Sequence, residues 1–120
     1  MQYRIVTDFQ RPPLSSNEQK RAHYHKVAKC KKLVGEQIKE RAEKIPRLGP
    51  VTVEVIWFVK DKRKRDTDGL GPFLKAACDG LVQAGVLEDD HSDFVVKTSM
   101  SIDKTDMGNP RIEVVITEVS

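Results

Sequence analysis

The stretch from Val51 to Lys60, VTVEVIWFVK, constrains the fold more than any other part of the chain. Every second position is valine or tryptophan, and the positions between them become apolar toward the end of the stretch. This alternation predicts a strand, and apolar residues on both faces predict that it is buried on both sides near its end. We therefore expect a central strand. Catalytic groups often follow such a strand, because the core holds the backbone rigid where the next loop meets solvent.

Two segments before this strand also have clear patterns. Residues 2–7 are predicted to form a first strand, which ends before Pro12-Pro13 because proline fixes φ and lacks an amide donor. Residues 18–44 are predicted to form a helix with a narrow apolar stripe, after candidate N-caps at 15–17. The other positions of this helix are rich in lysine, including Lys26 and Lys29. Such a face either binds phosphates or simply solvates the helix, and the pattern alone does not separate the two.

Two segments after the strand complete the expected fold. Residues 70–84 are predicted to form a second helix, with Pro72 in its first turn and Gly85 as its stop. Its buried stripe would be Leu70, Phe73, Leu74, Ala77, Leu81 and Ala84. The strands at 94–96 and 112–119 are predicted to form a hairpin around 105–110. The expected fold class is α+β, with one domain spanning 1–120 and a mixed sheet on which two main helices pack.

Composition indicates the number of domains and the cellular compartment. A chain of 120 residues, 38% of them hydrophobic, suits one core. The first residues lack the apolar stretch of a signal peptide, and no run approaches the roughly 20 apolar residues of a membrane span. We expect a cytoplasmic protein, with Cys30 and Cys78 reduced because they lie far apart without metal-binding spacing.

Charge is segregated along the chain. Residues 1–65 hold 17 Lys and Arg against 7 Asp and Glu, whereas residues 66–120 hold 4 against 11. The two parts therefore carry +10 and −7, which add to the net +3 of the whole chain. A basic part that can bind phosphates precedes an acidic part that can bind a metal. The densest basic run follows the central strand and includes Lys62, Arg63, Lys64 and Arg65.

Candidate metal ligands follow that basic run directly. Asp66 and Asp68 are two apart, so in an extended segment both carboxylates would point to the same side, roughly 6.6 Å apart by backbone rise. Carboxylate oxygens suit magnesium, a hard cation. The alternative is structural, because an Asp-x-Asp also occurs in turns and Asp68 could cap the next helix.

Further charged residues accompany the second helix. Lys75 and Asp79 are four apart, which is typical of a surface ion pair, although Lys75 could instead contact a scissile phosphate. Glu88, Asp89 and Asp90 bring carboxylates back after the helix, and they could equally form a solvated turn.

The order of these motifs resembles a known family. R-D-T-D at 65–68, K-x-x-x-D-G-L at 75–81 and A-G-V-L-x-D-D at 84–90 are similar to the RusA-type Holliday junction resolvases. The resemblance extends to the proline-rich connection ending in Ser16-Asn17 and to the valine-rich strand. Two departures are Gly69, where the family often has Asn, and the seven positions between Asp68 and Lys75, a longer spacing than in the compact family form.

The resemblance implies roles for particular residues. Asp66, Asp68 and Asp90 would be the metal-binding and catalytic carboxylates, with Lys75 the catalytic lysine. The spacing of fifteen between Lys75 and Asp90 selects Asp90 over Asp89. The implied cofactor is Mg²⁺, with no organic cofactor and no membrane. The implied source is a bacterial cell, with the protein encoded by the host or by a phage. The implied partners are branched DNA, in the form of a four-way junction, and a second copy of the chain.

Three other classes compete with this interpretation. A nucleic-acid-binding module without catalysis would use the basic residues for phosphates and the aspartates as caps and turns. A different metal nuclease would share the site but act on other branched or linear DNA. A small protein-interaction subunit would need none of these residues. The first and third leave unexplained why Asp66, Asp68, Lys75 and Asp90 occur together.

Overall fold

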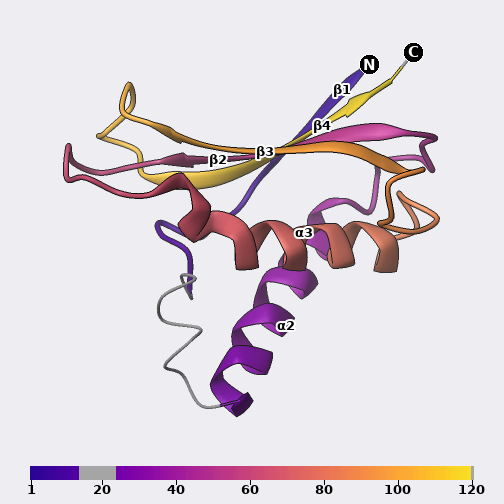
Figure 1. Ribbon diagram of the computed structural model, residues 1–120, viewed down its shortest axis with the longest axis horizontal. Helices are drawn as coiled ribbons and strands as arrows, with labels where there is room; N and C mark the ends of the chain where they lie inside the picture. Colours follow the sequence, from indigo (N-terminus) through magenta and orange to yellow (C-terminus); the bar gives the residue numbers. More distant parts are fainter. Residues whose placement is uncertain (14–23, 120) are drawn as a thin grey trace.

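The described part of the chain folds into a four-stranded sheet with two α-helices packed on one face. The computed structural model describes residues 1–13 and 24–119. All helical segments in this part of the chain lie on the same side of the sheet, and the other face is uncovered (Figure 1). The described elements, in chain order, are β1 (Gln2–Val6), α2 (Tyr24–Arg41), β2 (Val51–Phe58), the 3₁₀ helix η1 (Thr67–Leu70), α3 (Gly71–Gln83), β3 (Val95–Asp103) and β4 (Arg111–Glu118). The predicted α+β class is therefore confirmed.

β2 is central, as its sequence predicts. The strand order is β1-β4-β2-β3, so β2 pairs with β4 on one side and β3 on the other. Val51, Val53 and Val55 are fully buried. β3 runs parallel to β2 while β4 runs antiparallel to it, which makes the sheet mixed. The parallel pair is joined through η1 and α3, because parallel neighbours need a crossover connection.

The predicted C-terminal hairpin is wrong. Turn residues do lie between β3 and β4, at 104–110. β2 nevertheless lies between these two strands, each of which pairs with β2. The physical reason is burial: β2 buries Val51, Val53 and Val55 completely, which favours the middle of the sheet for β2 and leaves β3 at an edge.

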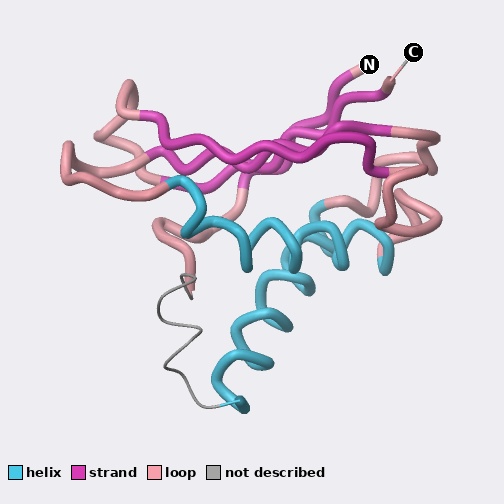
Figure 2. Tube along the Cα trace, viewed as in Figure 1, coloured by secondary structure: helices cyan, strands magenta, loops and turns pink. Residues whose placement is uncertain are grey.

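α3 supplies most of the helical side of the core. Seven of its residues are buried, among them the predicted stripe members Phe73, Leu74, Ala77 and Leu81. Leu70 is buried just before it in η1, and Ala84 is partly buried and packed against the core. In α2, by contrast, only Val34, Gly35 and Ile38 are buried. The N-terminal part of α2 extends away from the sheet (Figure 2).

The two helices meet almost backbone to backbone. A Cβ atom placed on Gly80 of α3 would lie 2.7 Å from the carbonyl oxygen of Gly35 and 2.9 Å from the Cβ of Ile38. No real side chain fits at those distances, so this crossing requires glycine at 80. The expected start of α2, at 18–23, and its candidate N-caps at 15–17 lie outside the described residues. Neither described α-helix is both long and apolar enough to cross a membrane.

Candidate active site

Asp66 and Asp68 lie where the chain turns from the basic loop into the helical layer. Asp66 is extended, with φ −91° and ψ 132°, and it is the N-cap residue of η1, although its side chain makes no cap hydrogen bond. Asp68 lies inside η1. The expectation of one extended segment through Asp66 and Asp68 is therefore wrong. Helical geometry begins at Thr67 and is closed by the hydrogen bond from Gly69 N to Asp66 O. Both aspartates are exposed, and the N-cap of α3 is Leu70, not Asp68.

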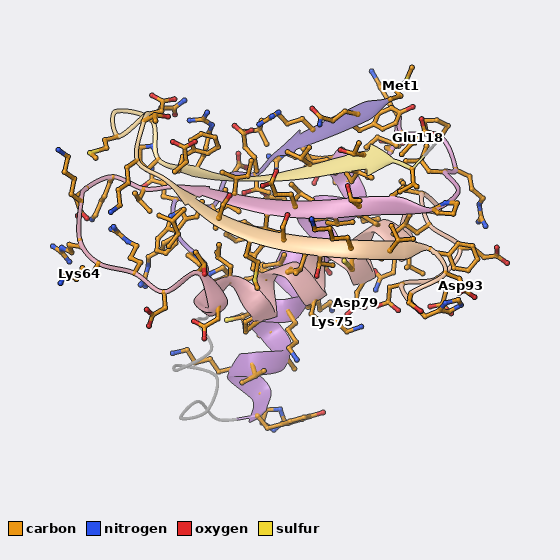
Figure 3. All side chains as sticks on the ribbon, turned by 45° about the horizontal axis from the view of Figure 1, so that its top comes forward. Met1, Lys64, Lys75, Asp79, Asp93 and Glu118 are labelled. Carbon is orange, nitrogen blue, oxygen red and sulfur yellow. The ribbon has the colours of Figure 1, made fainter. Side chains whose placement is uncertain are left out.

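Lys75, Asp79 and Asp90 form a cluster of charged side chains, hereafter the lysine cluster. Lys75 Nζ donates to Asp90 Oδ2 at 2.6 Å and lies 3.3 Å from Asp79 Oδ1. Lys75 and Asp79 lie side by side on α3, beneath the sheet (Figure 3). The cluster faces solvent, since the Lys75 side chain is 60% exposed. The structure thus brings together two of the four predicted catalytic residues, which are fifteen positions apart.

The helix end brings Asp90 back to Lys75. Gly85 has φ +80°, a left-handed conformation that favours glycine, and its N–H donates to Val82 O while Val86 N–H donates to Leu81 O. These two bonds are the Schellman motif, which reverses the chain direction. Val86 and Leu87 are then buried. Because these two side chains are held in the core, the chain that follows them stays next to α3, and Asp90 reaches Lys75.

Each member of the Lys75–Asp90 pair stabilises the charged form of the other. The hydrogen bond to Asp90, followed by the one to Asp79, raises the pKa of Lys75 above its usual range. The hydrogen bond from Lys75 lowers the pKa of Asp90, against the opposing effect of burial. Both groups are therefore charged at neutral pH. With Asp79 included, the lysine cluster holds two carboxylates and one ammonium, a net charge of −1.

The predicted metal ligands have suitable chemistry but are not gathered. Asp66, Asp68 and Asp90 offer carboxylate oxygens, the ligands that hard divalent cations prefer. Across residues 1–13 and 24–119, however, no group of three or more His, Cys, Asp or Glu side chains is placed to hold a metal ion. Asp90 contacts the Lys75 ammonium instead. The donor set fits a cation such as magnesium only if Asp90 exchanges this contact for the metal.

A hollow of about 270 Å³ adjoins the lysine cluster between α3 and the edge strand β3. Besides Lys75 and Asp90, its lining includes Cys78 and Thr98, which the sequence did not single out for the site. Burial raises the pKa of the Cys78 thiol to about 11, so it stays protonated and is a poor nucleophile. Thr98 gave no signal in the sequence because only the parallel pairing of β3 with β2 brings it near α3.

The predicted DNA-binding residues fall into two kinds of environment. Lys62, Arg63 and Lys64 are exposed in the loop after β2, and Lys64 lies at the outer end of the molecule (Figure 3). The side chain of Arg65 is only 15% exposed. Its guanidinium donates to Asp61 Oδ1 at 2.7 Å and lies 5.0 Å from the Trp57 ring centroid. Lys26 and Lys29 are exposed on α2.

Comparison with known families decides the classification. The family model described as endodeoxyribonuclease RusA matches residues 6–117. The chain belongs to the RusA endodeoxyribonuclease family. A search among individually curated proteins found no significant match. RusA membership makes the chain an endodeoxyribonuclease of a family that acts on branched DNA junctions, and the mixed sheet with two helices agrees with a RusA-like fold.

Proposed function

We propose that this RusA-family protein is a Mg²⁺-dependent endonuclease that resolves four-way DNA junctions by paired, symmetric nicks. Asp66, Asp68 and Asp90 would bind the metal, and Lys75 would contact the reacting phosphate. The contact between Lys75 and Asp90 carries this proposal. It joins a lysine from the start of α3 to a carboxylate from beyond its end, at a solvent-exposed place beside a hollow.

The chain's residues have separable roles in this mechanism. Magnesium, when bound, would supply Lewis acidity and lower the pKa of a coordinated water. Asp66 and Asp68 offer oxygens from the start of the helical layer, and Asp90 offers one from beyond its end. Lys75 would place positive charge where the phosphate gains negative charge in the transition state. Asp79 lies one helical turn from Lys75 and would keep the ammonium oriented if Asp90 held a metal instead.

The paired nicks require two copies of the site, so we propose a homodimer. β4 is unsuitable as a dimer interface because it lies inside the sheet and buries Ile112, Val114 and Ile116 in the core. β3 is an edge strand, and Val96 on it is 47% exposed. An edge strand offers unpaired backbone groups to a partner. Light scattering should give twice the 13.6 kDa of one chain, and a mass of one chain at assay concentration would contradict the dimer.

Cleavage of a labelled synthetic four-way junction tests the function, beside a linear duplex of matching sequence, with magnesium or EDTA. Wild type should nick the junction alone, at symmetric positions, and only with metal. Asp68→Asn should bind the junction but lose cleavage, because an amide is a poorer metal ligand than a carboxylate. Asp93→Asn, at an exposed aspartate outside the proposed ligand set, is the matched control and should cleave normally.

The remaining outcomes separate the alternatives. Equal cutting of junction and duplex would establish a nuclease without junction selectivity. Junction binding without any cutting would favour the non-catalytic module. Normal nicking by Asp68→Asn would remove Asp68 from the site.

A further inference from the structure

A second hollow, of about 760 Å³, is lined in part by Arg63 and Arg65, just before Asp66. Three segments line it: the loop at 8–13 after β1, the end of β2 with Lys60, and the basic loop after β2. The lining residues that matter here are Phe9, Arg11, Trp57, Lys60, Arg63 and Arg65. Its volume falls within the range of about 300–1,000 Å³ that is typical of small-ligand sites.

Contacts among these segments and with α3 hold this hollow, hereafter the Trp57 pocket, in shape. Trp57 Nε1 donates to Gln10 O at 2.9 Å, which ties the 8–13 loop to β2. Phe9 packs edge-on against Phe73 of α3 with 5.6 Å between ring centroids. Arg65 is held by Asp61 and lies over the Trp57 ring. The walls are therefore formed before any ligand binds.

The Trp57 pocket is positively charged. Among the described lining residues only Asp8 is acidic, and it is bound by Arg41 at 2.7 Å. Asp61 is shared between Arg65 at 2.7 Å and Arg63 at 3.5 Å, so one carboxylate faces two guanidinium groups. Arg11, Lys60 and Arg63 are exposed at the surface around the apolar rings. Cations beside aromatic surfaces are the arrangement by which proteins bind single-stranded nucleic acid.

The Trp57 pocket also lies close to the proposed cleavage site. Asp66 directly follows Arg65, and the backbone at Asp66 is extended. Successive side chains of an extended segment point to opposite sides, so the Asp66 carboxylate lies across the backbone from the Arg65 side chain that lines the pocket. A DNA strand whose phosphate reaches Asp66 would need only to cross this segment to place a neighbouring nucleotide in the pocket.

We propose that the Trp57 pocket binds one nucleotide of an unpaired DNA strand. Arg11, Lys60 and Arg63 would contact its phosphates, and the rings of Trp57 and Phe9 would contact sugar and base. An unpaired nucleotide fits because a base held in a duplex can present only its backbone to such a hollow. The site deepens the proposed function, since it rests on DNA being the substrate, but it requires no cleavage.

Fluorescence titration gives a direct test, because Trp57 is the only tryptophan in the chain. A short oligothymidylate would be added to the full chain in EDTA, so that binding is measured without cleavage. We expect saturable quenching of Trp57 emission, and at least about a tenfold weaker apparent affinity in Arg11→Ala/Lys60→Ala. The control Lys44→Ala/Arg47→Ala removes the same charges from exposed residues after α2 and should bind like wild type.

Two results would overturn the Trp57 pocket as a nucleotide site. One is the absence of quenching, or equal weakening in both double variants, which would mean that only net charge matters. The other is equal quenching by a hairpin duplex of the same phosphate number, which would mean that the pocket does not distinguish an unpaired nucleotide. Failure of the nuclease alone would appear differently, as normal quenching by a protein that cuts no DNA.

Discussion

Two clusters of charged side chains in this protein are built in opposite ways. In the lysine cluster one ammonium lies between two carboxylates, exposed to solvent. On the uncovered face of the sheet, one carboxylate, Glu113, lies between Arg4 and Arg111 and is only 4% exposed. Arg111 also binds Asp106 at 2.8 Å and stacks 3.9 Å from the Phe58 ring centroid. This second set is hereafter the Glu113 cluster.

The difference lies in charge and access. The Glu113 cluster contains two arginines and two carboxylates, so its charges balance, and its central carboxylate is almost completely buried. The lysine cluster keeps a surplus negative charge and is open. A balanced cluster with a buried centre suits a structural role, whereas an exposed cluster with surplus negative charge suits a further cation. The predictions below test this contrast.

The largest effect is expected on cleavage in Lys75→Met. Loss of the ammonium should slow junction nicking by about 10²–10³-fold, the range found when one charge-stabilising donor is removed. The free energy of unfolding should change by less than about 1 kcal/mol, because exposed ion pairs contribute little. Single-turnover nicking rates and urea denaturation measure the two effects. Lys104→Met, at an exposed lysine in the loop between β3 and β4, is the matched control.

Arg111→Met should show the reverse pattern. It leaves the buried Glu113 carboxylate with only Arg4, so we expect a loss of about 1–3 kcal/mol in the free energy of unfolding, measured by urea denaturation. Nicking at a temperature where the variant is folded should be near normal. Arg4→Met, which removes the more exposed partner, should cost less. Equal losses in the two variants would contradict the buried role given to Arg111.

The pH dependence of stability tests the Glu113 cluster. Burial works to raise the pKa of Glu113, but hydrogen bonds from Arg4 and Arg111 outweigh it, and its pKa is lowered from 4.5. A lowered folded-state pKa stabilises the protein above the unfolded-state value, and this stabilisation is lost as pH falls through the folded-state pKa. The stability difference between wild type and Glu113→Gln should therefore be largest at neutral pH and shrink below about pH 4.5. A difference that is constant with pH would contradict this linkage.

The smallest effect is expected for Asp79→Asn. Lys75 keeps its shorter contact to Asp90, so the stability should change by only a few tenths of a kcal/mol. If Asp79 orients Lys75 during cleavage, the single-turnover rate should fall about tenfold at saturating junction, with little change in junction affinity. A rate like that of Lys75→Met would show that Asp79 does more than orient the lysine.

Local patterns in the sequence predicted much of the fold. The alternation of 51–58 gave the central strand, and the apolar stripe and Gly85 gave the limits of α3 within a few residues. The position of β3 was missed, because strand order depends on which neighbour buries more surface. Turn residues between β3 and β4 do not encode that choice.

The candidate site was also predicted only where local motifs determine it, and not where it depends on contacts between distant segments. Spacing within the family motifs selected Lys75 and Asp90, which the structure brings into contact. The start of η1 at Thr67 was not anticipated, so the geometry of Asp66 and Asp68 was predicted wrongly. Thr98 and the Trp57 pocket depend on contacts between segments far apart in the chain, which motif spacing cannot reveal.

Metal binding at named carboxylates tests the central claim most directly. Amide NMR spectra would be recorded while Mn²⁺, a paramagnetic substitute for magnesium, is added at low stoichiometry to wild type and Asp68→Asn. We predict selective broadening of signals from 66–69 and 88–91, little broadening around Glu113, and loss of the effect in the variant. Broadening centred on Glu113, or the same weak broadening along the whole acidic part of the chain, would contradict a metal site formed by Asp66, Asp68 and Asp90.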